Sequence, residues 1–199
     1  MSSTLPSGES SEIRQRILNA AIPLFAQRGY GSASVRELSG AAGVTKPTLY
    51  YHFGNKEGLF VAAVESAVDR FHQAVIDAIK MPGTLRERLH YAIHAQTRTA
   101  RSNPDAFRLL LNAEYHSGAG QPRVDLMSIH VRNAQFLEAL LREGIASGEL
   151  KPDLDPGCAV IAFVGMIGTT CQAMLYGFEM PENLPARLTD IFFDGVGNP

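Results

Sequence analysis

A stretch of twenty residues in the first third of the chain constrains the fold most, because it predicts two short helices joined by a tight turn. Ser34 and Thr45 are good N-cap residues, so a helix is expected to begin after each of them. Between them, Gly43 can adopt the positive φ that such a turn needs. Pro47 falls in the first turn of the second helix, where no backbone donor is required. The predicted helices cover residues 34–41 and 45–52.

The rest of the chain also predicts helices. Apolar residues recur at helical spacing, and no run of residues alternates as a strand would. The first helix is expected to run from Ser11 to about Gly29, and Pro23 predicts a bend in it near residues 19–23. Further helices are expected at 55–80, 84–101, 104–116, 124–147, 155–178 and 183–193. We therefore expect an all-α fold of about nine helices.

The composition is typical of a soluble globular protein, with 45% hydrophobic and 19% charged residues. Residues 1–10 are polar and are expected to form a disordered tail. They lack the charged and apolar regions of a secretory signal, which favours a cytoplasmic location.

The charge distribution favours a nucleic-acid partner for one end of the chain, although the net charge of −2 does not. Residues 1–56 hold six basic and three acidic side chains, whereas the remainder holds twelve basic and seventeen acidic ones. A basic head on an acidic body is the asymmetry expected when only the head contacts phosphate.

The second short helix carries the side chains that a DNA-reading helix needs. Its start offers Lys46 and Thr48, which can reach base edges or phosphates. Donors follow at Tyr50, Tyr51 and His52. Arg36 in the first short helix is long enough to reach guanine or phosphate, and Lys56 adds its charge to the start of the long helix. The alternative is a half-buried aromatic cluster beside solvated lysines.

Residues 13–60 closely resemble the tetracycline-repressor (TetR) family. The resemblance lies in Ala42–Thr45 and Thr48–Leu59, and in the similarity of residues 17–30 to the first helix of that family. It implies a DNA-binding domain over 11–56 and a helical ligand-binding and dimerisation domain over 57–199. The DNA contacts that it implies are Ser34, Arg36, Thr45, Lys46, Pro47, Thr48, Tyr50, Tyr51, His52 and Lys56.

The segment 155–178 is apolar on all sides and long enough to cross a membrane. Its polar residues, among them Gln172, and the absence of flanking basic residues favour a buried or subunit-interface helix instead. A core helix within one chain is the alternative to a homodimer interface. The predicted interface residues are Val160, Phe163, Val164, Ile167, Gly168, Cys171, Met174 and Leu175. Cys158 and Cys171 are expected to be free, buried thiols.

The family resemblance also implies an effector pocket in the helical body. The long helix 55–80 is then expected to be the only element that joins head and body, and to transmit effector binding to the DNA-reading helix. The candidate pocket residues, each of which has a role in the core as its alternative, are Phe71, His94, Arg98, Phe107, Leu111, Tyr115, Phe136, Met166 and Met174.

The motifs that would indicate an enzyme are missing, because the chain has no P-loop, dinucleotide fingerprint or nucleophile elbow. No cofactor or metal is expected, although His90 and His94 have a spacing that allows two ligands on one metal. The sequence predicts a homodimeric, ligand-responsive repressor that binds a palindromic DNA operator. A metal-responsive regulator and a protein-interaction module without DNA binding are the alternatives.

Overall fold

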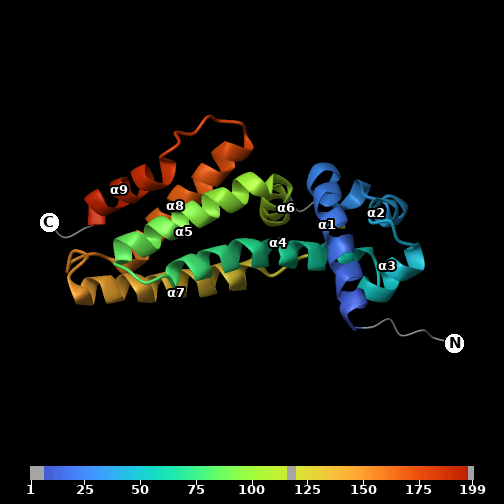
Figure 1. Cartoon of the computed structure of the whole chain (residues 1–199), viewed down its shortest axis with the longest axis horizontal. Coiled ribbons are helices and arrows are strands. Elements are labelled where there is room, and N and C mark those ends of the chain that lie inside the picture. The colour runs from blue at the N-terminus through green and yellow to red at the C-terminus, as the bar shows by residue number, and fades with distance from the viewer. Residues whose placement is uncertain (1–6, 116–119, 197–199) are drawn as a thin grey trace. The chain divides into compact units, whose positions relative to one another are not determined.

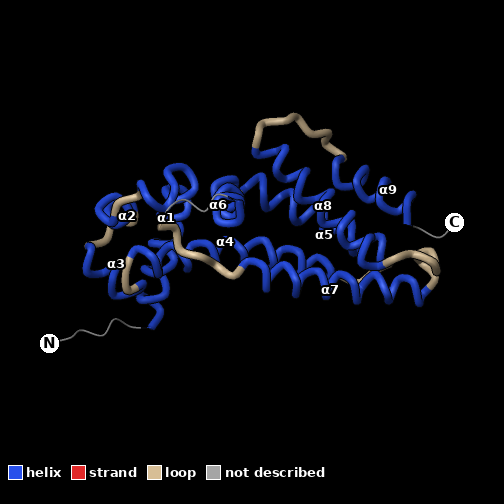
Figure 2. The backbone as a smooth tube through the Cα atoms, turned by 180° about the vertical axis from the view of Figure 1, so that it is seen from behind, coloured by secondary structure: helices blue, strands red, loops and turns tan. Residues whose placement is uncertain are grey.

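A computed structural model describes residues 7–115 and 120–196 of the chain. Nine α-helices and no strand lie in these described ranges, which confirms the expected all-α fold (Figure 2). The helices form two compact units. The first unit comprises the chain up to Asp69 together with 104–124, and the second comprises Arg70–Asn103 and the chain from Asp125 onward.

The first unit contains α1 (Ser7–Ser32), α2 (Val35–Ala41), α3 (Lys46–Phe53), the start of α4 (Lys56–Ile79) and α6 (Pro104–Tyr115). The domain boundary predicted between 56 and 57 therefore differs from the division in the structure. Helix α6 packs against α1, where Asn112 Nδ2 donates a hydrogen bond to the Ala26 carbonyl at 3.0 Å. This contact joins residues far apart in the sequence, so the sequence did not predict it. The largest fully buried side chains of this core are Ile17, Leu18, Phe25, Leu38, Leu49, Leu59, Phe60 and Leu109.

Helix α1 differs from the prediction in where it begins and in where its helical geometry is interrupted. It begins at Ser7, so part of the predicted tail is helical, while residues 1–6 lie outside the described residues. The bend expected near Pro23 is not seen in the backbone angles. Instead the helical path breaks at Gly29, where φ is 75° and ψ is 164°. A glycine reaches this left-handed region without steric cost, whereas the proline keeps helical angles and forgoes one hydrogen bond.

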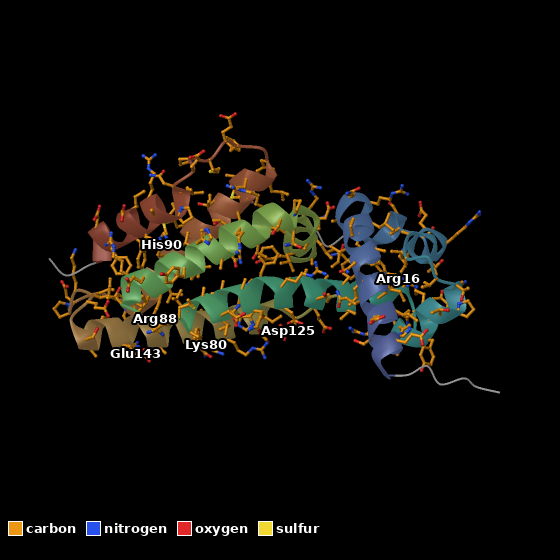
Figure 3. All side chains as sticks on the ribbon, in the orientation of Figure 1. Arg16, Lys80, Arg88, His90, Asp125 and Glu143 are labelled. Carbon is orange, nitrogen blue, oxygen red and sulfur yellow. The ribbon has the colours of Figure 1, made fainter. Side chains whose placement is uncertain are left out.

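The second unit contains the end of α4 with α5 (Leu85–Ser102), α7 (Leu126–Ser147), α8 (Pro156–Leu175) and α9 (Leu184–Val196). Figure 1 shows α8 and α9 lying along α5. His90 Nδ1 lies 3.3 Å from Thr189 Oγ1 of α9, on the side of α5 seen in Figure 3. At the start of α5, the Leu85 N–H donates to the Glu149 carboxylate at 2.8 Å. These contacts fix α5 as the central helix of the unit.

Helix α8 is the one helix in the described part of the chain that is long and apolar enough to cross a membrane by length and composition. Only 22% of its apolar stretch is buried. The two cysteines of α8 differ, since Cys171 is buried and Cys158 is exposed, so the prediction of a buried thiol is wrong for Cys158. Burial raises the pKa of the Cys171 thiol to about 11.

Candidate nucleic-acid interface

Helix α2 begins with a capping box. The Ser34 hydroxyl accepts a hydrogen bond from the Glu37 N–H at 3.2 Å, and the Glu37 carboxylate accepts one from the Ser34 N–H at 3.0 Å. Hydrogen bonds from the backbone and the hydroxyl of Ser34 lower the pKa of Glu37, which also pairs with Arg28. The Ser34 hydroxyl is thus already hydrogen-bonded within the capping box. Ser34 is nevertheless exposed, and the Glu37 carboxylate lies beside it.

The turn between α2 and α3 has the geometry that its glycine predicts. Gly43 has φ of 62°, and Ala42 ends α2. The Arg16 side chain, labelled on α1 in Figure 3, donates from Nε to the Ala42 carbonyl at 3.1 Å. Arg16 was not among the predicted site residues, because its partner lies 26 positions away. It holds the end of α2 against α1 and so positions the turn.

Helix α3 presents a defined face to solvent. Thr45 caps it by accepting a hydrogen bond from the Thr48 N–H at 3.3 Å. Leu49 and Phe53 are buried on its inner side. The outer side is therefore formed by residues at other helical positions, and Lys46, Pro47 and Tyr51 are exposed there. The Tyr51 side chain is 69% exposed.

Tyr50 and His52 are half-buried beside this exposed face. The Lys46 Nζ is 5.3 Å from the centre of the Tyr50 ring, close enough for a cation–π contact. The His52 ring stands edge-on to Tyr51, with centres 5.1 Å apart. Burial, and secondarily the nearby Arg14 charge, lowers the pKa of His52 below its ordinary value. The lowered pKa favours the neutral form of the His52 imidazole.

Lys56 has a structural partner that sequence reasoning missed. Its ammonium donates to the Gly31 carbonyl at 3.3 Å and stands 4.4 Å from the centre of the Tyr30 ring. Burial lowers the pKa of Lys56. These contacts tie the first turn of α4 to the end of α1, so Lys56 holds the DNA-binding unit together in addition to carrying charge at a helix N-terminus.

The corner between α3 and α4 explains the sequence Gly-Asn-Lys-Glu-Gly at 54–58. Asn55 accepts a hydrogen bond from the Gly58 N–H at 2.7 Å and thereby caps α4. A Cβ on Gly58 would lie 2.2 Å from the Phe53 carbonyl oxygen, so only glycine fits. Gly54 has φ of 74°. This corner fixes the end of α3 relative to α4, and neither Asn55 nor Gly58 was predicted to have a role in the site.

The ten predicted DNA-contact residues lie on α2, α3, their caps and the first turn of α4. Six are exposed and four are half-buried. The exposed group is Ser34, Arg36, Thr45, Lys46, Pro47 and Tyr51, and the half-buried group is Thr48, Tyr50, His52 and Lys56. The exposed group combines two cations with hydroxyl donors and no carboxylate of its own. Chemically, it suits a phosphate backbone and base edges.

The predicted effector-pocket residues are divided between the two units. Phe107, Leu111 and Tyr115 lie on α6 in the first unit, and Tyr115 is exposed. In the second unit, Phe71 is buried, Met166 and Met174 are half-buried, and His94, Arg98 and Phe136 are exposed. The exposure of His94 and Arg98 follows from their helical phase, since Ile93 and Thr97 occupy the inner face of α5. We therefore correct the prediction that these two line an enclosed pocket.

The predicted dimer-interface residues are also divided, here between two faces of α8. Val160, Phe163, Ile167 and Cys171 are buried within the second unit, and the Phe163 ring lies 5.2 Å from that of Phe192. We correct the prediction for these four, because their side chains are not at the surface. Val164 and Gly168 are exposed, and Met174 and Leu175 are half-buried. In the described residues, no group of three side chains is placed to hold a metal ion, and His90 contacts Thr189.

Two segments of the chain match known families. Residues 17–63 match the family described as bacterial regulatory proteins, tetR family, and residues 82–172 match the tetracyclin repressor-like C-terminal domain. The HTH-type transcriptional repressor ComR of Escherichia coli is 32% identical over 148 residues, which cover 71% of this chain and 70% of ComR. The chain belongs to the TetR family. It is therefore a DNA-binding transcriptional regulator and not an enzyme.

Other similar proteins are transcriptional regulators too. The HTH-type transcriptional activator FasR of Mycolicibacterium smegmatis is 34% identical over 104 residues, and the chain spans about half of its length, 48%. A TetR-family regulator from Marinobacter aquaeolei has the same fold, with a TM-score of 0.78 at 23% identity over 98% of this chain and all of that one. FadR of Bacillus subtilis, solved with stearoyl-CoA, gives a TM-score of 0.72 at 23% identity over 91% and 98%. Each of these proteins is named as a transcriptional regulator or activator.

Proposed function

We propose that this TetR regulator is a cytoplasmic repressor that binds a palindromic operator through the outer face of α3. The observation that carries the proposal is the orientation of that helix. Leu49 and Phe53 are buried, which leaves Lys46, Pro47 and Tyr51 to face outward. A short helix with an exposed polar start matches how recognition helices enter the major groove. Arg36 on α2 is exposed beside it and adds a second cation.

The proposal assigns base reading to Arg36 and Lys46, and this can be tested by sequence selection. Wild-type protein and the Arg36→Ala and Lys46→Ala variants would each select binding sites from a random DNA pool. Loss of a base contact is expected to relax the preference at one or two positions of each half-site, at a cost of about 1–3 kcal/mol. Lys80→Ala is the control, because Lys80 is an exposed lysine just after α4. An unchanged preference in both variants would show that these side chains only position the protein.

The dimer proposed here uses the exposed face of α8. Ile161 is 74% exposed and Val164 52% exposed, although both are apolar. Gly165 and Gly168 share the exposed side, and a Cβ at either would meet nothing within 4 Å. The fold of one chain therefore does not need these glycines, whereas a closely approaching helix of a second copy does.

The effector proposed here binds the second unit and lowers operator affinity. Stearoyl-CoA, the ligand of FadR, is the first compound to titrate, because it is bound in a structure of the same fold. A fall in affinity for the promoter DNA of the gene at fixed salt would identify it as an effector. An unchanged affinity would assign the role to a different compound.

A further inference from the structure

Helix α5 carries a polar side chain in the middle of its buried face. Gln96 follows Leu85 by about three helical turns, so the two side chains point to the same side of the helix. Leu89 and Ala92 also lie on this side, and both are buried. The residues two positions before and two positions after Gln96 are exposed, because they lie on the opposite side. An amide therefore interrupts the apolar inner face of α5.

The amide oxygen of Gln96 is buried without a hydrogen-bond partner, although the residue as a whole is half-buried. The neighbouring Thr97 is satisfied, since its hydroxyl donates to the Ile93 carbonyl at 2.8 Å. An unpaired buried acceptor lowers stability, so native proteins keep few of them. In the part of the second unit that the structure describes, no other buried side-chain oxygen or nitrogen lacks a partner. This oxygen is therefore a candidate for contact with a ligand.

The side chains next to Gln96 on the inner face of α5 are small. Ala92 lies one turn before it and Ala100 one turn after it, and both are buried. Neither has a polar side-chain atom that could bond the amide, and neither reaches beyond its own Cβ. Helix α5 therefore neither covers nor satisfies this amide with its own adjacent side chains.

The face of α5 that carries this amide is turned toward α7 and the end of α4. Leu85 fills the space beside Gly144 of α7, because a Cβ on that glycine would lie 2.3 Å from Leu85 Cδ2. Three residues further on, Arg88 Nε donates to the carbonyl of Ile79, the last residue of α4, at 2.8 Å (Figure 3). His90 is turned the other way, toward α9. The amide therefore points into the interior of the second unit and not toward α9.

We propose that Gln96 is the polar anchor of an effector site in the second unit, which takes an apolar molecule with a neutral hydrogen-bond donor such as a hydroxyl. This assigns a place and a chemical class to the effector, and it rests on the proposed function. The amide oxygen accepts the donor hydrogen, and the surrounding aliphatic side chains bury the rest of the molecule. A charged effector is disfavoured, because an ion buried without a counter-ion costs more than a neutral group. The arginines that follow in α5, Arg98 and Arg101, are exposed and provide no counter-ion.

The first test measures stability without added ligand, on samples that native mass spectrometry shows to carry no bound small molecule. Gln96→Met keeps the length of the side chain and removes its polar atoms, so the urea midpoint is expected to rise. Gln96→Leu repeats the change with a different apolar shape. Gln135→Met is the control, because Gln135 is exposed on α7, and its midpoint should equal that of wild type. An unchanged or lower midpoint in both Gln96 variants would show that the protein itself satisfies the amide, which overturns the proposal.

The second test uses 1-octanol and 1-methoxyoctane, of which only the alcohol can donate a hydrogen bond. Isothermal titration calorimetry measures their dissociation constants for the intact protein in the absence of DNA. Wild type is expected to bind the alcohol about tenfold more tightly, the factor expected for a hydrogen bond to an otherwise unpaired buried group. Gln96→Met should bind both compounds equally, whereas Gln135→Met should keep the preference of wild type.

The outcomes separate this anchor from the proposed function. If wild type binds neither compound or does not prefer the alcohol, or if Gln96→Met keeps the preference, the anchor is refuted. Operator affinity is then measured with and without 1-octanol. If the alcohol is bound through Gln96 but operator affinity does not change, the binding site stands and its role as an effector site fails. If wild type does not bind its promoter DNA specifically, the proposed function fails and the binding result is unaffected.

Discussion

At the scale of single residues, the corner between α3 and α4 leaves no room for a methyl group on Gly58. Its Cβ would lie 2.2 Å from the Phe53 carbonyl, so Gly58→Ala must displace the start of α4. We expect the variant to lose about 1–3 kcal/mol of unfolding free energy, measured by urea denaturation. Gly40→Ala is the matched control, since a Cβ there meets nothing within 4 Å inside α2, and it should be neutral or stabilising by about 0.5–1 kcal/mol. Equal stability of the two variants would refute the geometry of the corner.

Lys56 gives a second prediction at this scale. Lys56→Met keeps the aliphatic stem but removes the hydrogen bond to Gly31 and the cation over Tyr30. We expect a loss of about 1 kcal/mol in unfolding free energy, seen as a lower thermal midpoint. Lys46→Met, at an exposed position on α3, should leave that midpoint unchanged. A stable Lys56→Met variant would mean that this lysine serves DNA alone.

Residue roles that depend on local sequence were predictable, and those that depend on distant partners were not. Ser34, Gly43 and Thr45 have the cap and turn geometry expected of their types, because capping needs only neighbours three residues away. Lys56 bonds a carbonyl 25 residues away, and Asn112 bonds one 86 residues away. No periodicity or motif in the chain indicates such pairs.

At the scale of elements, caps and breakers predicted most helix bounds, although α1 begins at Ser7 and not at Ser11. The orientation of the two faces of α8 was not predictable in this way. Both of its faces are apolar, so periodicity could not separate the face buried against Phe192 from the exposed one. The same limit applies to α6. Its apolar face is clear from the sequence, but the loops on either side of it do not indicate that this face packs against α1. Elements were thus predictable one at a time, whereas their packing partners required the structure.

The exposed face of α8 leads to a prediction about assembly. Ile161→Arg places a charge on the apolar exposed side, where Ile161 makes little contact with its own chain. We expect the dissociation constant of the dimer to rise at least about 100-fold, because an unpaired charge in an apolar interface is costly. The helical content of the monomer should be retained. Light scattering over a concentration series measures this. Ala139→Arg, at an exposed position on α7, is the control, and a dimer that survives Ile161→Arg would exclude this face.

At the scale of the whole molecule, the chain divides its chemistry between two units. The exposed cations and hydroxyls of α2 and α3 belong to the first, while the exposed apolar face of α8 belongs to the second. Under the proposed function, the first unit reads DNA and the second pairs with a second copy of the chain. Each half-site contributes few base contacts, so the pairing decides how much specificity the two recognition helices achieve together.

The central claim is that two chains together recognise one specific DNA site. Fluorescence anisotropy with labelled promoter DNA of the gene, compared with scrambled DNA of equal length and composition at the same salt, tests it most directly. The account predicts a stoichiometry of two chains per site and an affinity for the promoter roughly 10³-fold or more above that for scrambled DNA. Equal affinity for the two DNAs, or saturation at one chain per site, would contradict it.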